Sequence, residues 1–562
     1  MRSLRTLLLA ACLASAPAAA QDFVAISYHD LIDDPGDLAY DGATLASLVQ
    51  QLDWLKANGY RAVSIDDVLA AHSGRRPLPD KAVLLTFDDG YLSFYEDVFP
   101  LLKAFGYPAV LAVVSSWLDV PAGRSVQYGD RPVPRERFIT WEMAREMAAS
   151  GLVEIASHSH DLHHGVVANA QGNALPAAVA RRFDAAHGVE TERVYAARIR
   201  ADLARSAERI AARTGKRPRV LVWPFGRYNA TTVGIAEDLG FRLALTLDPE
   251  IGDTNAPMTV GRAYLTRDPD LEDLKNALEG RRNVPVLRGL CLRVDDLYDG
   301  SDAEAALGRG IEKVRALAPT AVLLRADAVS SADSGPSVWF AGSRLPLRAD
   351  YFGRAAWQLR SRAGVQVLGW LPLASVREGG DSTGAYGALG RTVPIDGLVI
   401  GDAPLATQLP PAGAAALATW DPRAPRRARA ESTASSGARD TLSAVAAFTS
   451  EVPAALFVDA LPLDSLPIPQ DAALQVADYL AVQTSGDPRA ALARLRELGW
   501  LARPYADRLV WWSDSTDPAV WDAVTAAGIR NLVFCPATLP DAATLARLAP
   551  SISGAVYPYR PK

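Results

Sequence analysis

Cysteine is scarce in this chain of 562 residues, which contains three, at positions 12, 291 and 535. So few cysteines exclude a scaffold that is built on disulfides. Cys291 and Cys535 each lie in an apolar run typical of a buried strand, so we expect buried, unreactive thiols. A disulfide between them is compatible with an oxidising compartment, but the sequence does not establish one.

The sequence also lacks a basic excess, and no long apolar run follows its first 20 residues. Its 58 lysines and arginines against 64 aspartates and glutamates give a net charge of −6. This balance argues against nucleic acid and anionic membranes as partners. We expect no transmembrane helix after the first 20 residues, and the length favours two domains.

The first 20 residues predict a secretory signal peptide. Arg2 and Arg5 precede an apolar run over residues 7–16, and small residues end the segment at Ala20. We expect cleavage after Ala20 and therefore an exported, periplasmic protein. Residues 9–12 (Leu-Ala-Ala-Cys) also resemble a bacterial lipobox, which would instead put a lipid on Cys12 and anchor the chain to the outer membrane.

Apolar strand-like runs alternate with amphipathic helices along the rest of the chain, which is typical of an α/β fold with parallel strands. We expect a first domain over residues 21–275 and a second over residues 284–562, whose repeated strands predict a (β/α)8-like barrel. The Arg-, Ala- and Ser-rich stretch 422–437 predicts a loop. The predicted strands cover residues 23–28, 82–85, 109–114, 153–156, 220–224 and 243–247, then 286–294, 321–326, 365–371, 397–400, 454–458, 479–484, 510–512, 532–535 and 554–557.

Two adjacent carboxylates follow one of these strands. Asp88 and Asp89 stand between Phe87 and Gly90, and four of the seven histidines fall within residues 158–164, after another strand. Either motif alone is compatible with an ordinary turn or polar loop. Together they favour a metal site, because histidine nitrogen and aspartate oxygen bind divalent transition metals and the second carboxylate can act as a base. The pattern predicts a centre that activates water.

Further short motifs accompany these two. They are residues 27–30 (Ser-Tyr-His-Asp), 86–91, 155–159, 166–172, 223–226 (Trp-Pro-Phe-Gly), 345–350 and 356–360. Together they resemble the polysaccharide deacetylase superfamily (carbohydrate esterase family four), and specifically its poly-β-1,6-N-acetylglucosamine N-deacetylases of the PgaB type. The resemblance covers nearly the whole chain after the signal peptide. It implies a circularly permuted, distorted (β/α) barrel for the first domain.

The resemblance also implies a metal site. Asp89, His158 and His163 would bind one divalent ion, which could be zinc, nickel, cobalt or iron. His164 is the alternative third ligand, and Asp88 would be the general base that activates water.

An acid that protonates the departing amine is implied as well. Ordinary family members carry this histidine late in the domain, but no histidine follows His187 here. The permuted order of the subfamily implies His29 instead, and we expect Asp30 to orient its ring.

Other residues would contact the substrate. The backbone N–H of Tyr91 would help to hold the oxyanion. Trp223 and Phe225 would wall the sugar groove, and Leu245 would lie in the pocket for the acetyl methyl group. The Arg-Pro-Pro-Tyr motif of ordinary members is replaced by residues 223–226, so the sequence leaves open how Asp88 is held.

The second domain resembles a glycoside hydrolase that cuts partly deacetylated poly-glucosamine. Asp295 and Asp296 follow its first strand, and Asp402 is the surviving aspartate of a family motif, so these three are the candidate carboxylates. The alternative is a domain that only binds the cationic product, through aspartates and tryptophans such as Trp339, Trp511 and Trp512. The sequence leaves both open.

The function that the resemblance implies is metal-dependent removal of N-acetyl groups from exported poly-β-1,6-N-acetylglucosamine, for export and biofilm formation. The implied partners are this polysaccharide and an outer-membrane export machinery. A chitin-oligosaccharide or peptidoglycan deacetylase is the alternative enzyme. A polysaccharide-binding export module without catalysis is the alternative of another class.

Overall fold

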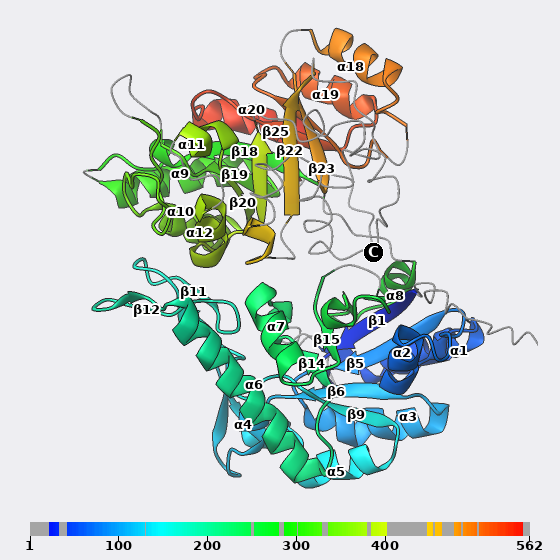
Figure 1. Cartoon of the computed structure of the whole chain (residues 1–562). Helices are drawn as coiled ribbons and strands as arrows, with labels where there is room; N and C mark the ends of the chain where they lie inside the picture. Colours follow the sequence, from blue (N-terminus) through cyan, green and yellow to red (C-terminus); the bar gives the residue numbers. More distant parts are fainter. Residues whose placement is uncertain are drawn as a thin grey trace, which may run out of the picture.

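The structure is a computed structural model that describes residues 22–32, 42–129, 131–248, 252–279, 286–300, 302–328, 335–378, 384–401, 447–452, 456–463, 477–484, 487–502 and 505–554. The signal peptide with Cys12, the stretch 422–437 and Asp402 lie outside the described residues. Two α/β units are visible, one coloured blue to green and one green to red (Figure 1). The limits 21–275 and 284–562 for the two domains remain predictions.

The first unit is built on a nine-stranded sheet. Its main path runs β15-β14-β9-β6-β5-β1-β16, with all neighbours parallel except β1 and β16. The expected α/β fold of this part is therefore confirmed. The strands are β1 (Asp22–Tyr28), β4 (Arg61–Ala62), β5 (Ala82–Phe87), β6 (Ala109–Val113), β9 (Val153–Ser157), β14 (Val220–Val222), β15 (Leu243–Leu245), β16 (Gly252–Asp253) and β17 (Ala263–Tyr264).

Helices connect and cover these strands (Figure 1). Side chains cap the N-termini of several of these helices. Ser64 and Asp67 form a capping box at α2, and the Thr191 side chain caps α6. The helix α6 ends at Gly215, whose φ of 80° is favourable for glycine. The helices are α1 (Leu45–Ala57), α2 (Ile65–His72), α3 (Phe99–Phe105), α4 (Ser115–Leu118), α5 (Trp141–Ala149), α6 (Glu192–Thr214), α7 (Ala230–Asp238) and α8 (Leu271–Leu278).

The register of the sheet brings the polar motifs to one edge. Tyr28 of β1 pairs with Phe87 of β5, so the residues that follow both strands are neighbours. Val113 of β6 pairs with Ser157 of β9, which carries His158 to the same edge. Carboxyl ends of parallel strands are where α/β folds place their chemistry.

The second unit is a closed barrel of parallel strands from β18 to β25. This confirms the predicted (β/α)8-like barrel, whereas the predicted strand 554–557 is described only at Gly554, which lies outside any strand. The strands are β18 (Arg288–Arg293), β19 (Ala321–Arg325), β20 (Gln366–Trp370), β21 (Gly397–Gly401), β22 (Leu456–Pro462), β23 (Tyr479–Gln483), β24 (Leu509–Ser513) and β25 (Asn531–Phe534). The helices are α9 (Ala303–Leu317), α10 (Phe352–Gln358), α11 (Leu373–Glu378), α12 (Gly384–Thr392), α18 (Pro488–Glu497), α19 (Pro518–Ala526) and α20 (Ala542–Ile552).

Direct contacts join the two units. A hairpin of β10 (Gly165–Val167) and β11 (Ala174–Pro176) follows the histidine cluster. From its tip, Asn169 donates a hydrogen bond to the Thr392 carbonyl at 2.9 Å, and Gln171 donates one to the Asp350 carbonyl at 2.8 Å. The family motif 166–172 therefore forms an interdomain contact. Among the described residues, no helix has the length and apolar character needed to cross a bilayer.

A disulfide links the first and last strand regions of the barrel. Cys291 of β18 is bonded to Cys535, directly after β25, across 244 positions of the sequence. Our expectation of two free thiols is therefore wrong. The two residues lie together because β18 and β25 pair where the barrel closes, a contact that no local sequence pattern reveals.

We predict that this disulfide stabilises the second unit. A loop of this size constrains the unfolded chain strongly, so the double variant Cys291→Ser/Cys535→Ser should lose about 2–5 kcal/mol of unfolding free energy. Urea unfolding followed by circular dichroism measures the loss. Reductant should lower the midpoint of the wild type and leave that of the variant unchanged; a wild type insensitive to full reduction would contradict the prediction.

Candidate metal centre

Asp88 is held by a buried arginine. Arg262, 1% exposed, donates from Nη1 to Asp88 Oδ1 and from Nη2 to Asp88 Oδ2, both at 2.8 Å. The same guanidinium donates to Thr86 Oγ1 at 2.9 Å and to the Thr246 carbonyl at 3.0 Å. Burial alone raises the pKa of Asp88, but the charge and hydrogen bonds of Arg262 outweigh it and hold that pKa well below its usual value. Asp88 is therefore a carboxylate throughout the physiological range.

The sequence leaves open which residue holds Asp88, and the structure shows that it is Arg262. It comes from the segment between β15 and β17, far from the 223–226 motif where ordinary family members carry their arginine. Nothing around Arg262 in the sequence marks it as a site residue. Only the fold shows that this segment passes beneath Asp88.

Asp89 has a different environment. It is fully buried, and its Oδ2 accepts a hydrogen bond from the Tyr128 hydroxyl at 2.7 Å. Its Oδ1 lies 3.4 Å from His158 Nε2 and 3.4 Å from His163 Nε2, and among the described residues it has no hydrogen-bond donor. Burial raises the pKa of Asp89 above its usual value. The ligand atoms of Asp89, His158 and His163 all lie within 4.8 Å of one another.

His158 presents a lone pair, and not a proton, to Asp89. His158 Nδ1 lies 2.8 Å from the Val222 carbonyl, which can only accept, so Nδ1 carries the proton and Nε2 does not. Burial lowers the pKa of His158 and of His163 to about 4, so both rings are neutral at neutral pH. An unprotonated nitrogen facing a carboxylate oxygen is unfavourable unless a cation lies between them. The donor set therefore fits a divalent metal ion.

The third member of this group is His163. The histidine ring of this residue packs between Trp117, Tyr128 and Phe225, with ring centroids 5.1, 5.2 and 4.4 Å away. His164 is not part of the ligand group. The His160 ring contacts Ser115 Oγ through Nδ1 at 2.9 Å.

His29 follows β1 at the same edge of the sheet. The Asp88 N–H donates to the carbonyl of Tyr28 at 3.0 Å, so His29 and Asp88 follow two directly paired strands. Its Nδ1 is buried and has no partner among the described residues. The predicted contact with Asp30 is wrong: the Asp30 carboxylate accepts from Ser93 Oγ at 2.6 Å and pairs with Arg137 instead. The ring of Tyr264, 4.9 Å from that of His29, is its observed neighbour.

The predicted substrate contacts are corrected in part. Trp223 and Leu245 have no exposed surface and belong to the core, which contradicts their predicted roles as groove wall and methyl pocket. Phe225 is 42% exposed and Tyr264 is 38% exposed. Two exposed aromatic rings therefore flank the centre, one against His163 and one against His29. The predicted role of the Tyr91 N–H remains a prediction.

Left-handed backbone geometry is concentrated at this centre. Asp89, Ser159 and Phe225 have φ values of 72°, 72° and 57°, a region that residues other than glycine rarely adopt. Such geometry persists only where surrounding contacts enforce it, and it is common at functional sites.

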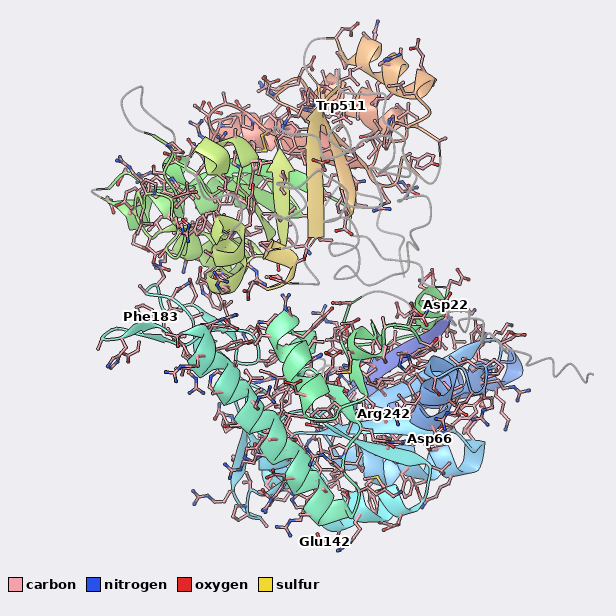
Figure 2. All side chains as sticks on the ribbon, in the orientation of Figure 1. Asp22, Asp66, Glu142, Phe183, Arg242 and Trp511 are labelled. Carbon is pink, nitrogen blue, oxygen red and sulfur yellow. A yellow bond between two sulfur atoms is a disulfide. The ribbon has the colours of Figure 1, made fainter. Side chains whose placement is uncertain are left out.

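Two of the three candidate carboxylates of the second unit lie at the carboxyl end of its first barrel strand. Asp295 and Asp296 directly follow β18; Asp295 accepts from Trp339 Nε1 at 3.3 Å, and Asp296 lies 3.9 Å from Arg293. Asp402 is outside the described residues. Trp511 is buried inside the unit, so its predicted place in a groove is wrong (Figure 2).

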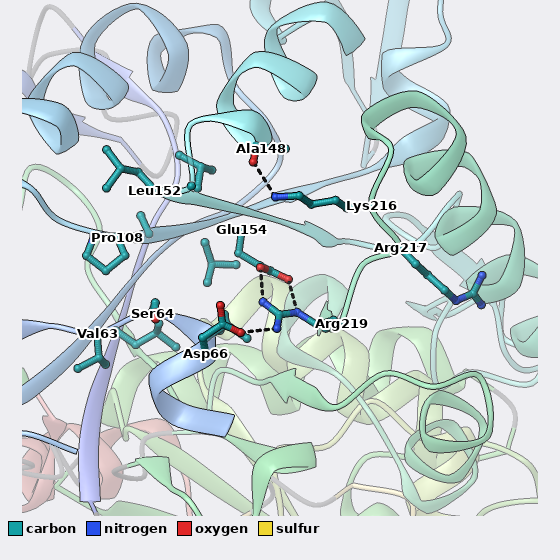
Figure 3. A pocket seen from close by; sticks show the side chains of 16 residues that line it. Val63, Ser64, Asp66, Pro108, Ala148, Leu152, Glu154, Lys216, Arg217 and Arg219 are labelled. Atoms are coloured by element: carbon teal, nitrogen blue, oxygen red, sulfur yellow. Dashed lines mark hydrogen bonds and ion pairs between the residues drawn. The ribbon is translucent and has the colours of Figure 1, made fainter. Parts of the chain in front are cut away.

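A cavity of about 500 Å³ lies at the opposite, amino-terminal ends of the first unit's strands. Its charged lining is already paired: Arg219 Nη2 lies 2.8 Å from Glu154 and Nη1 lies 2.5 Å from Asp66 (Figure 3). These ion pairs join α2 to β9 and the start of β14. These ion pairs therefore stabilise the amino-terminal end of the sheet. In such folds, this face usually serves stability and the opposite face carries the active site.

Two segments of the chain match known protein families. Residues 75–244 match the polysaccharide deacetylase family, and residues 292–386 match the hypothetical glycosyl hydrolase family 13. The first unit is therefore similar to polysaccharide deacetylases.

Particular relatives narrow the resemblance. The chain is 38% identical, over 367 residues, to the poly-beta-1,6-N-acetyl-D-glucosamine N-deacetylase of Escherichia coli K12, covering 65% of this chain and 55% of the relative. It thus spans little more than half the length of that relative. Among solved structures, a de-N-acetylase from Aggregatibacter actinomycetemcomitans is 38% identical (TM-score 0.43; 46% of this chain and 100% of that one). The BpsB deacetylase domain from Bordetella bronchiseptica is 42% identical (TM-score 0.39; 43% and 95%).

We predict that Arg262→Met destabilises the protein in a pH-dependent way. The variant leaves Asp88 buried without its partner, which should cost about 3–5 kcal/mol of unfolding free energy at neutral pH. Without Arg262, burial raises the folded-state pKa of Asp88 above its unfolded value, so acidification toward pH 4 protonates it and reduces the cost. Urea unfolding of metal-free protein between about pH 4 and 7 measures this.

Arg135→Met is the matched control. Arg135 is also buried, but it donates only to backbone carbonyls, those of Leu118, Val120, Phe138 and Ile139. Its loss should cost stability by an amount that does not depend on pH over this range. Equal pH dependence of the two variants would contradict the role assigned to Arg262.

Proposed function

We propose that the first unit hydrolyses N-acetyl groups of exported poly-β-1,6-N-acetylglucosamine, using one divalent cation held by Asp89, His158 and His163. One observation carries the proposal: neutral imidazole nitrogens and a carboxylate oxygen converge beside a second carboxylate that an arginine keeps ionised. The name of the similar protein from Escherichia coli K12 supports the choice of substrate. Zinc, nickel, cobalt and iron all suit this donor set.

The residues around the centre divide the chemistry of amide hydrolysis. A divalent cation at this site would polarise the acetamide carbonyl and make water acidic enough for a weak base to act on it. Asp88, ionised and fixed in orientation by Arg262, accepts the proton of the attacking water. His29, on the neighbouring strand, donates a proton to the departing amine. The C–O bond to water forms first, and the C–N bond then breaks as the amine takes its proton, which leaves acetate and a glucosamine residue.

Two aromatic rings position the sugar. Phe225 and Tyr264 are exposed beside His163 and His29, so their faces can stack on pyranose rings on either side of the reacting acetamide. This arrangement suits a polymer that extends past the site in both directions.

The second unit then acts on the product. Deacetylation creates amines, and Asp295 and Asp296 lie at the carboxyl end of a barrel strand, where a cationic sugar chain can be bound or cut. The proposal also includes where the protein acts in the cell. The N-terminal sequence supports a periplasmic location, with the polysaccharide and an outer-membrane export machinery as partners.

We predict that the purified protein with a divalent cation releases acetate from β-1,6-linked N-acetylglucosamine oligomers. Chelation should abolish the release, and Asp88→Asn or His29→Ala should each lower kcat by about 10²–10⁴-fold, because each removes a proton-transfer group. An enzymatic acetate assay measures these rates. His187→Ala, which changes an exposed histidine, should match the wild type.

Other substrates test the alternatives. Acetate released from chitin oligomers or peptidoglycan, but not from the β-1,6 series, would overturn the substrate assignment. Binding of the β-1,6 polymer without acetate release at any cation tested would favour the export module that only binds.

We also predict that Phe225→Ala and Tyr264→Ala each raise KM for a β-1,6 pentamer about 3- to 10-fold, as expected from the loss of roughly 1 kcal/mol of stacking. The kcat should change little, because neither ring transfers a proton. Steady-state kinetics with the oligomer measures both constants. Leu347→Ala, an exposed apolar residue of the second unit, is the control. An unchanged KM in both aromatic variants would exclude the stacking role.

A further inference from the structure

A hairpin that the sequence did not mark extends over the metal centre. It consists of β7 (Ser125–Tyr128) and β8 (Arg131–Pro134), which pair antiparallel. Tyr128, the last residue of β7, donates its hydroxyl hydrogen to Asp89 Oδ2 at 2.7 Å. The contact joins positions 39 residues apart, from the end of β7 to the turn after β5.

The tyrosine ring is fixed in place. Its centroid lies 5.2 Å from that of His163, 5.2 Å from that of Trp117 and 6.3 Å from that of Tyr91. Contacts with these three rings restrict the orientation of the Tyr128 side chain. The hydrogen bond is therefore built into the packing and is not a chance surface contact.

This hydrogen bond determines which oxygen of Asp89 is available. A free carboxylate can rotate about its Cβ–Cγ bond and present either oxygen. Because Oδ2 accepts from Tyr128, Oδ1 is the atom that faces both histidine Nε2 atoms, 3.4 Å from each. The donor is neutral, so it orients the carboxylate without cancelling its charge. Partners of this kind commonly account for 10- to 100-fold of metal affinity.

We propose that Tyr128 is a positioning residue that sets the cation affinity of the centre by fixing the Asp89 carboxylate. This inference deepens the proposed function and rests on its cation site. The same tyrosine packs against His163, so it holds two of the three ligands from one side. The β7–β8 hairpin thereby belongs to the metal centre even though it supplies no ligand.

The test is the Zn²⁺ affinity of Tyr128→Phe in the full-length chain. Removing one hydroxyl keeps the ring and its packing, so we expect the metal-free variant to fold, with its unfolding midpoint lowered only by the loss of one hydrogen bond. The dissociation constant for Zn²⁺, measured by competition with a chromophoric chelator, should rise about 10- to 100-fold. Acetate release should fall at limiting Zn²⁺ and return to the wild-type kcat at saturating Zn²⁺.

Tyr95→Phe is the matched control. The Tyr95 hydroxyl also donates to a carboxylate, Glu146 Oε2 at 2.7 Å, but on the outer surface. It should bind Zn²⁺ like the wild type.

The outcomes separate the two proposals. If the wild type binds Zn²⁺ and Tyr128→Phe binds it equally well, the positioning role is overturned and the proposed function stands. If Tyr128→Phe binds more weakly and added Zn²⁺ does not restore kcat, the role in cation affinity is insufficient and the inference is likewise overturned. If the wild type itself binds no divalent cation, both proposals fall.

Discussion

The candidate site depends on how the chain accommodates two consecutive buried carboxylates. Asp88 and Asp89 follow a fully buried strand, and neither has appreciable contact with water. Burying a charge is costly unless it is paired. The buried ion pair with Arg262 offsets this cost for Asp88, one of the two carboxylates. It also joins β5 to the segment after β15, because the same guanidinium contacts Thr86 and the Thr246 carbonyl. Catalytic geometry and fold stability thus share one interaction.

The parallel sheet turns residues that are distant in sequence into neighbours. His29, Asp88 and His158 follow three different strands whose registers end at the same edge. The second residue after β5 and the second after β9, Asp89 and Ser159, adopt left-handed geometry, which turns the chain sharply at the edge. The strands supply the positions, and the strained turns supply the directions of the side chains.

The parts of this arrangement that follow local patterns could be predicted from sequence. Strand runs, the Asp-Asp-Gly turn and the clustered histidines are local, and the α/β fold, the closed barrel and the group Asp89, His158 and His163 agree with them. Arg262, Tyr128 and Tyr264 were missed, because each reaches the site from an irregular segment or the end of a short strand through a contact between distant residues. The disulfide was missed for the same reason. Trp223 shows the opposite error: its motif lies near the site, but its side chain turns into the core.

The partners of the two aspartates explain why neighbours with similar burial take different roles. Asp88 receives a full positive charge from Arg262, which lowers its pKa and leaves it no net charge to offer a cation. Asp89 receives a hydrogen bond from a neutral hydroxyl, so its charge remains uncompensated and one oxygen faces two neutral imidazoles. Were the arginine on Asp89, its charge would oppose a cation there, and Asp88 would become the ligand or lose its proton-accepting role. The assignment of base and ligand is therefore fixed by the donors that the fold places behind each carboxylate, and not by the Asp-Asp motif itself.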